Sequence, residues 1–356
     1  MKTINLIIFG IGNVGAELIN QTLIYNSLLP NENQPRIYVP ILANSKKAYF
    51  TKGLSQDWQD KFQQEAISYT IESILSYKER CQLKNCVVID ATACENFVHH
   101  YPLFLKHHCH IVAANKAANS SDIEFYKRLR TLLQGCNKTF LYETNVGAAL
   151  PIIETVKNLN ASSDTIHKIR GVFSGSLSYL FNRFSEEDVR FSQLLTEASE
   201  YGFTEPDARD DLSGKDVARK VLILARELGV HKNLDEVKVQ SLVPKHLNGS
   251  TSLSEFNSRK EELDVFFQSY KTQIKQNTVL RYIGELDVAK KELNVSLQPI
   301  EKNTPLGQLK DTDNLFEIYS AHYKINPLVI QGAGAGKEVT ASGVLTDVLK
   351  IAQTFC

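Results

Sequence analysis

Residues 4–15 read INLIIFGIGNVG, an apolar run rich in isoleucine that leads directly into three spaced glycines. Helical spacing of apolar side chains follows, carried by Val14, Leu18, Ile19 and Leu23. Strand, glycine turn and helix in this order predict a dinucleotide-binding unit. Gly10 permits the tight turn, Gly12 lets a pyrophosphate approach the backbone, and Gly15 lets helix and strand pack closely. The helix start at Asn13 and Val14 attracts the anion. The alternative is a glycine-rich turn that binds nothing.

Short apolar runs continue to alternate with helical stretches beyond this unit. Strands are predicted at about 37–42, 87–90, 110–116 and 139–153, with a helix over 122–133 and loop and helix over 48–85. This alternation is typical of an α/β protein with a Rossmann-like, doubly wound parallel sheet. Ligands of such sheets bind beyond the carboxyl ends of the strands, which is where Thr92 lies.

The second predicted strand ends in Asn44, Ser45, Lys46 and Lys47. Units that prefer NAD usually place an acid at this point to bind the ribose hydroxyls. Here an amide, a hydroxyl and two ammonium groups stand instead, and such groups bind a 2′-phosphate. We therefore expect Asn44 and Lys46 to contact NADP, with NAD as a second possible cofactor. The alternative is a solvated basic turn.

Composition excludes several classes of function. The chain has 356 residues, is 43% apolar and 22% charged, and carries a formal net charge of zero. A neutral balance argues against nucleic acid or an anionic membrane as the main partner. Six cysteines occur without a CxxC pair, which favours reduced thiols of a cytoplasmic protein over a disulfide framework or a zinc site. No apolar run is long enough to span a membrane, and the first residues do not resemble a signal peptide.

A second informative stretch is residues 202–220, GFTEPDARDDLSGKDVARK, which leads into the apolar run 221–228. Ser213 is predicted to cap the helix at its N-terminus, and Gly229 to end it. Asp216 and Lys220 are four residues apart, so they share one helix face. The plain interpretation is a surface ion pair. However, Lys220 lies between apolar neighbours on that helix, and a partly desolvated lysine is suited to proton transfer.

After residue 166 the strands no longer alternate regularly with helices. Strands are predicted at about 237–242, 279–286, 294–299 and 315–320, with helices between them, including one over 252–274. This mixture predicts an α+β domain rather than a second doubly wound sheet. Near the end, a glycine-rich segment up to Gly336 precedes a last helical pattern.

The 202–220 stretch resembles the signature of homoserine dehydrogenases, G-[YF]-T-E-P-x-x-[RS]-D-D-L-x-G-x-D-x-x-R-K, and matches it throughout. IRGVFSGSLSYLFNRF from residue 169 onward and the Asn115-Lys116 pair are similar to further blocks of that family. The resemblance covers Gly10 to about Ala352. It implies a reversible NAD(P)-dependent interconversion of L-homoserine and L-aspartate 4-semialdehyde, in the biosynthesis of threonine, methionine and isoleucine. A short monofunctional form is expected, without aspartate kinase or ACT domain.

The resemblance also implies roles for single residues. Glu205 and Asp216 bind the substrate, while Lys220 and Lys116 orient it, and one of these lysines moves the proton. Lys116, Gly336 and the glycine loop contact the cofactor. Backbone carbonyls bind a monovalent cation such as Na⁺, carried over by position to Glu143, Val146, Ala148 and Leu150.

The expected domains follow from the same resemblance. Residues 1–148 form the nucleotide-binding domain, the terminal helix at about 335–356 packs back on it, and residues 149–334 form a substrate-binding and dimerisation domain. A homodimer is expected, since the strands of the second domain would otherwise expose an apolar face. Two rivals stay open. One is an oxidoreductase of another small amino or hydroxy acid, and the other is a cofactor-sensing protein without catalysis.

Overall fold

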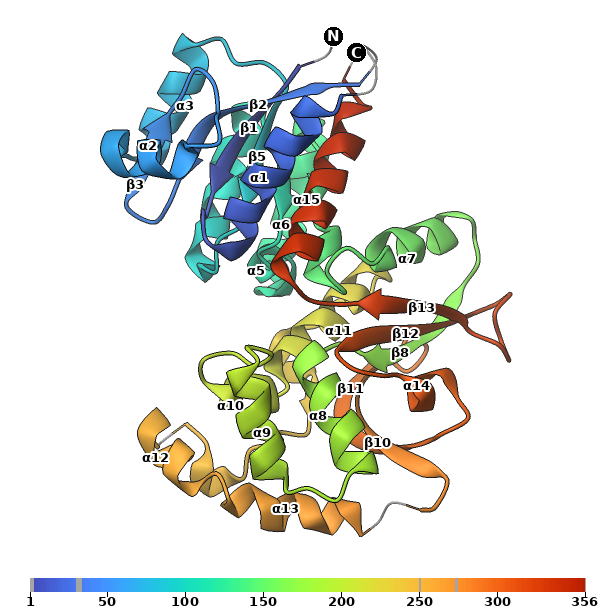
Figure 1. Cartoon of the computed structure of the whole chain (residues 1–356). Coiled ribbons are helices and arrows are strands. Elements are labelled where there is room, and N and C mark those ends of the chain that lie inside the picture. The colour runs from blue at the N-terminus through green and yellow to red at the C-terminus, as the bar shows by residue number, and fades with distance from the viewer. Residues whose placement is uncertain (1–2, 30–33, 250, 273–274, 356) are drawn as a thin grey trace. The chain divides into compact units, whose positions relative to one another are not determined.

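The computed structural model describes residues 3–29, 34–249, 251–272 and 275–355. The chain divides into two compact units, the first formed by residues 1–149 and 336–356 and the second by residues 150–335 (Figure 1). No helix in the described ranges is long and apolar enough to cross a membrane.

A seven-stranded sheet in the order β4-β3-β2-β1-β5-β6-β7 forms the centre of the first unit. β2, β1, β5, β6 and β7 run parallel, as a Rossmann-like fold requires, while β3 and β4 join antiparallel at one edge. The prediction of loop and helix over 48–85 was therefore incomplete, because these two strands have only four and two residues, too few to show a strand pattern. The bounds are β1 Thr3–Phe9, β2 Arg36–Ala43, β3 Lys47–Phe50, β4 Ile67–Ser68, β5 Cys86–Asp90, β6 His110–Ala113 and β7 Phe140–Leu141.

Helices surround this sheet, and one of them comes from the far end of the chain. α15 (Lys337–Ala352) lies beside α1 (Asn13–Ser27), and both contribute to the core cluster around β1 and β2 (Figure 1). Val344, Val348 and Ile351 are fully buried there, at the spacing of one helix face. The remaining helices are α2 Trp58–Glu65, α3 Ile71–Arg80, η1 Glu95–His100, α4 Tyr101–Lys106, α5 Ala117–Ser120, α6 Ile123–Cys136 and η2 Glu143–Asn145.

The long strand predicted over 139–153 was wrong. β7 has two residues, and η2 follows it after Tyr142. Gly147 and Ala148 then take positive φ angles of 75° and 53°, which an extended strand cannot hold. The chain turns there and enters α7 (Ile152–Ala161), the first helix of the second unit.

The second unit has a six-stranded sheet in the order β13-β12-β8-β10-β11-β9. All its described pairings are antiparallel except that of β11 with β9, so the predicted α+β class is confirmed. The sequence analysis missed β13, which is half exposed and rich in glycine at its end. The strands are β8 Ile166–Val172, β9 Lys238–Val239, β10 Thr278–Asp287, β11 Glu292–Glu301, β12 Asp313–Ser320 and β13 Leu328–Ala333.

Helices α8 and α11 cover one face of this sheet (Figure 1). A Cβ on Gly284 of β10 would lie 2.7 Å from the Val221 side chain of α11, so glycine permits this close packing. The helices of the unit are α7, α8 Gly175–Glu186, α9 Phe191–Glu200, α10 Ala208–Leu212, α11 Lys215–Glu227, η3 Leu234–Glu236, η4 Lys245–Leu247, α12 Leu253–Arg259, α13 Glu262–Lys271 and α14 Pro305–Gln308.

The opposite face of the sheet is not the apolar surface that the dimer argument assumed. Successive side chains of a strand point to opposite faces, so the neighbours of the covered Gly284 row point away from the helices. Two ion pairs lie on this side, Lys168–Glu285 at 2.8 Å and Arg170–Glu317 at 2.7 Å. The buried apolar side chains of this face gather at the end covered by α14, while Val329, in register with Glu317, is partly exposed.

Candidate active site

The glycine loop between β1 and α1 has the geometry of a pyrophosphate site. Gly10 has a φ of +89°, and a Cβ there would lie 2.5 Å from the Ala91 carbonyl oxygen. A Cβ on Gly15 would lie 1.8 Å from the Gly10 oxygen, so both positions need glycine. Gly12 faces open space, and α1 begins there without a hydrogen bond from any capping side chain. Uncapped amides next to open space, at Asn13, Val14 and Gly15, fit a phosphate group.

A buried carboxylate that the sequence analysis missed organises the neighbouring strand ends. Asp90 ends β5 and is fully buried, which raises the pKa of its carboxyl group. It accepts hydrogen bonds from the Thr92 hydroxyl at 2.7 Å, the Tyr101 hydroxyl at 2.7 Å and the Asn115 amide at 3.0 Å. Asp90 thus fixes Thr92 beside the glycine loop, where the Thr92 amide nitrogen is 2.9 Å from a Cβ built on Gly10.

Lys116 follows Asn115 at the end of β6 and precedes the short helix α5. The Asn115 side-chain oxygen accepts from the Ala117 backbone amide at 3.0 Å, while the Asn115 side-chain nitrogen donates to Asp90. The Lys116 carbonyl accepts from the Asn119 and Ser120 amides. Lys116 is half-buried, and the hydrogen bond of its neighbour Asn115 to Asp90 helps to hold its backbone in place.

Asn44 and Lys46 form a tight turn between β2 and β3. The Asn44 side-chain oxygen accepts from the amides of Lys46 at 2.8 Å and Lys47 at 2.7 Å, so the asparagine shapes the turn. Both lysine side chains are exposed. Ala43, next to Asn44, accepts from the Gly10 amide at 2.8 Å, so this basic turn lies beside the glycine loop.

The remaining predicted positions, Gly336 and the cation segment, are backbone sites. Gly336 caps α15 with a φ of +114°, faces open space and has no capping side chain, as at α1. In the predicted cation segment, the Glu143 carbonyl accepts from the Val146 amide at 3.3 Å, and Ala148 has a left-handed conformation. Leu150 is the first residue of the second unit, and its carbonyl accepts from the Ile152 amide at 2.8 Å.

Lys220 occupies the centre of the second unit's polar cluster. Its side chain is held in the first half of α11, and the residue is only 8% exposed. The Nζ atom donates to the Phe173 carbonyl at 2.7 Å and lies 2.9 Å from an Asp216 carboxylate oxygen. Asp216 is half exposed, so the pair has one buried and one accessible end. The simple surface ion pair is thus excluded, because its lysine is inside the protein.

The start of α11 differs from the prediction. Ser213 ends α10 instead of capping α11, and Gly214 is the N-cap with a φ of +72°. A Cβ on Gly214 would lie 2.0 Å from the Tyr282 hydroxyl, which donates to Gln240. Only glycine can both adopt this positive φ and leave room for the Tyr282 hydroxyl at this position of the signature. The other end agrees with prediction, since Gly229 follows the helix at a φ of +73°.

Asp211 joins the loop of Glu205 to the start of α8. One of its carboxylate oxygens accepts from the Glu205 amide at 2.8 Å, and the other accepts from the Ser176 hydroxyl at 2.6 Å. Burial raises the pKa of Asp211, and the nearby charge of Asp216 adds to that rise. Glu205 itself is exposed on this loop. The sequence analysis named the acidic run but missed the positioning role of Asp211 and Ser176.

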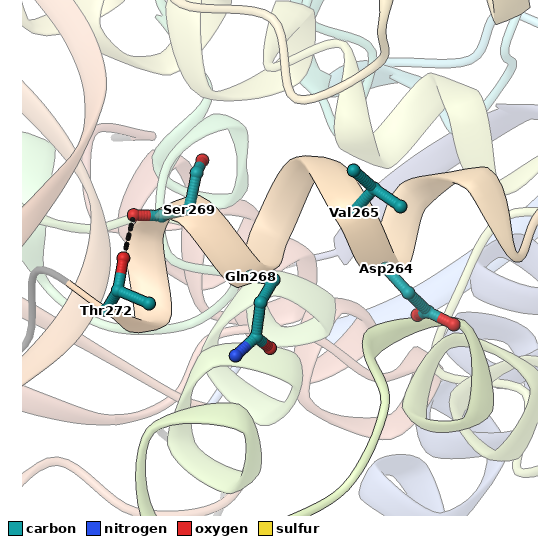
Figure 2. A pocket seen from close by; sticks show the side chains of 5 residues that line it. All are labelled: Asp264, Val265, Gln268, Ser269 and Thr272. Atoms are coloured by element: carbon teal, nitrogen blue, oxygen red, sulfur yellow. Dashed lines mark hydrogen bonds between the residues drawn. The ribbon is translucent and has the colours of Figure 1, made fainter.

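A surface hollow of about 430 Å³ lies elsewhere, along α13. Figure 2 shows its lining side chains on successive turns of that helix, namely Asp264, Val265, Gln268, Ser269 and Thr272. Asp264 is already used, because it accepts from the Ser192 amide and hydroxyl. None of the predicted site residues lines this hollow.

Comparison with known proteins gives consistent matches. The homoserine dehydrogenase family matches residues 151–349, and the NAD-binding domain of homoserine dehydrogenase matches residues 10–143. The chain is 38% identical, over 98% of its length, to a bifunctional aspartokinase/homoserine dehydrogenase of Buchnera aphidicola, of which it spans 43%. It is 37% identical to a homoserine dehydrogenase of Paracoccidioides brasiliensis, with 98% of both chains covered.

Solved structures give the same fold. A Candida auris protein described as of unknown function has a TM-score of 0.89 and 35% identity over 99% of both chains. A hyperthermophilic archaeal homoserine dehydrogenase mutant in complex with NADPH has a TM-score of 0.75 at 19% identity, again over 99% of both chains, and this likeness shows the fold alone. The two family matches and the full-length relative show that the chain belongs to the homoserine dehydrogenase family.

Proposed function

We propose that the chain catalyses the reversible, nicotinamide-dependent interconversion of L-homoserine and L-aspartate 4-semialdehyde. The observation that carries this proposal is the buried Lys220 ammonium, fixed between the Phe173 carbonyl and Asp216 within the family signature. In the reductive direction a bound nicotinamide would supply a hydride to C4 of the semialdehyde, and the Lys220 ammonium can give a proton to the alkoxide oxygen that develops there. In the oxidative direction the neutral amine of the same lysine would take the proton of the C4 hydroxyl.

Lys220 and Lys116 are both assigned to substrate orientation, and one of them moves the proton. The geometry favours Lys220 as a preorganised group, because its partners leave its ammonium little freedom to rotate. Glu205 and Asp216 are assigned to the substrate's ammonium and hydroxyl groups. Both carboxylates are accessible, and Asp211 fixes the loop from which Glu205 extends.

The cofactor is assigned to the glycine loop, Thr92 and Gly336, with a preference for NADP. Gly12 offers open space in front of the uncapped start of α1, which suits the pyrophosphate. Beside it the exposed ammonium groups of Lys46 and Lys47 suit a 2′-phosphate. The Asn44 amide oxygen is bound within the turn, so the lysines and the Asn44 NH₂ group are the groups left for that contact.

A monovalent cation such as Na⁺ is assigned to the carbonyls of Glu143, Val146, Ala148 and Leu150. The turn-rich path of this segment supports the proposal, since Gly147 and Ala148 have positive φ angles that change the direction of successive carbonyls. Thermal midpoints measured in Na⁺ and in tetramethylammonium chloride at equal ionic strength test it. A higher midpoint in Na⁺ supports the site, and equal midpoints contradict it.

We further infer a cytoplasmic homodimer formed through the second unit. The support for pairing is the sheet face that carries the Arg170–Glu317 pair, because Val329, in register with Glu317 on that face, is an apolar residue that is 37% exposed. The support for a reducing compartment is that five described cysteines are free thiols, while Cys356 lies outside the described residues. Light scattering with a twofold monomer mass agrees with this inference, and a stable monomer contradicts it.

Steady-state assays of Asp216→Asn test the assigned substrate role. This change keeps the size of the side chain but removes the charge beside Lys220. We expect kcat/KM for homoserine to fall by about 10- to 100-fold, the usual loss when a charged hydrogen bond to a substrate is removed. An unchanged kcat/KM would return Asp216 to a structural role.

A further inference from the structure

Asn314 of β12 is a buried amide that no other described residue explains. The residue has no solvent exposure, and neither its Nδ2 nor its Oδ1 atom has a hydrogen-bond partner in the described part of the chain. Buried side-chain amides in folded proteins are almost always paired, so such a group calls for a reason. An amide kept unpaired in one state is available for a bond in another.

The surroundings of Asn314 indicate where that bond can form. Across the sheet Asn314 pairs with Gly332, and a Cβ built on Gly334 would lie 2.0 Å from the Asn314 side-chain nitrogen. The backbone of residues 333–335 therefore covers the amide directly. Gly334 lacks the side chain that would hold its own peptide groups away from the amide.

Residues 333–335, which cover the amide, also lie close to Gly175, near the Phe173 carbonyl that binds Lys220. A Cβ built on Gly175 would lie 3.8 Å from the Ala335 side chain and 2.9 Å from the Thr312 carbonyl. Gly175 follows Phe173, whose carbonyl holds Lys220. Along the chain, Gly336, the open N-cap of α15, directly follows this segment. Residues 333–335 thus connect the Lys220 cluster with a proposed cofactor contact.

We propose that Asn314 is a positioning residue: when the cofactor binds, its amide hydrogen-bonds to the peptide groups of residues 333–335. The unpaired amide raises the free energy of the ligand-free state, and the new bond removes that cost in the bound state. Cofactor binding is then strengthened by the difference between the two states. This inference rests on the proposed function only in taking a nicotinamide cofactor as the ligand.

The first test is Asn314→Leu, which keeps the branched shape of the side chain, adds some volume and removes its polar atoms. The dissociation constant for NADPH, measured by calorimetric titration, should rise about tenfold, the effect of one ordinary hydrogen bond. The change in kcat at saturation should stay within about twofold, because a bond made equally in the ground and transition states alters binding only. Without ligand, the thermal midpoint should equal or exceed that of the wild type, since an unpaired amide has been removed.

Asn182→Leu is the matched control. Asn182 is also a buried asparagine of the second unit, but its amide donates to the Asp311 carbonyl at 3.0 Å. Its replacement should lower the midpoint and leave the NADPH dissociation constant within about twofold of the wild type. If Asn314→Leu behaves like this control, the Asn314 amide is satisfied in the ligand-free protein and the proposal fails.

A second pair of variants tests the contact itself. Gly334→Ala should weaken NADPH binding, because the added methyl group pushes residues 333–335 away from the amide. In an Asn314→Gly background both the amide and the Cβ that would lie 2.5 Å from the added methyl group are gone, so the same change should weaken binding less. Equal effects in both backgrounds would overturn the proposal. Failure of the wild type to bind NADPH would contradict the proposed function instead, before any variant is compared.

Discussion

Replacing Lys220 with methionine removes the ammonium group and keeps most of the apolar stem of this buried side chain of α11. The lost group donates to the Phe173 carbonyl at 2.7 Å and lies 2.9 Å from Asp216. A positioned acid–base group contributes about 10²- to 10⁴-fold to a rate, equal to about 3–5 kcal/mol of barrier. We therefore expect Lys220→Met to lower kcat for homoserine oxidation by at least about a hundredfold.

Folding should survive this change. The Phe173 carbonyl loses its described side-chain donor, which costs about 1–3 kcal/mol, less than the stability of most domains. The NADPH dissociation constant should stay near the wild-type value, because Lys220 is not among the assigned cofactor contacts and its partners are Phe173 and Asp216. Lys215→Met is the matched control, since Lys215 starts the same helix with an exposed side chain and should keep wild-type turnover.

The assay follows nicotinamide absorbance in both directions, with circular dichroism and cofactor titration on the same samples. A folded Lys220→Met variant that binds NADPH but turns over slowly supports the assignment. Turnover within about tenfold of the wild type, in a variant with an intact fold, would refute it and leave Lys116 as the proton carrier.

Three further predictions follow from other parts of the structure. Lys46→Ala/Lys47→Ala should lower kcat/KM for NADP about tenfold and leave kcat/KM for NAD unchanged, which steady-state kinetics can measure. A wild-type preference for NAD that the change leaves unaltered would mean that these exposed lysines face solvent only. Gly214→Ala should destabilise the protein more than Gly229→Ala in urea unfolding, because both have positive φ but only the first Cβ would meet a tyrosine hydroxyl, at 2.0 Å, and equal effects would refute this. Burial, helped by a nearby lysine, lowers the pKa of His110 to about 4 from 6.5, so the unfolded chain binds the proton first and stability falls as the pH drops between these values. His110→Asn should remove up to about 3 kcal/mol of that fall, and parallel pH profiles would contradict it.

The cofactor unit was readable from the sequence because its requirements are local. Gly10 and Gly15 are demanded by backbone contacts within a few ångströms, and such demands appear as fixed spacings. Strands β3 and β4 were missed because the pairing of β3 with β2 and of β4 with β3, rather than their own sequence pattern, makes them strands. The strand predicted over 139–153 failed for the opposite reason, since apolar residues there are buried in a turn and a helix start.

The candidate active site was only partly readable. Lys220 and Asp216 were identified by their helical spacing, but the Phe173 carbonyl that binds the lysine comes from a segment 47 residues away. Asp90 and Asp211 were not singled out as positioning groups because their partners are backbone amides and hydroxyls brought together by folding. The prediction of an apolar sheet face for dimerisation was wrong, because alternate side chains of β8 form ion pairs there with side chains of β10 and β12.

The most direct test of the central claim is the substrate specificity of the purified wild-type chain. Reduced nicotinamide is followed with homoserine, malate or aspartate as the substrate and with NADP or NAD as the cofactor. We expect rapid reduction with homoserine, faster with NADP than with NAD, and none above background with malate or aspartate. Turnover of malate equal to that of homoserine, or cofactor binding without turnover of any of the three, would contradict it.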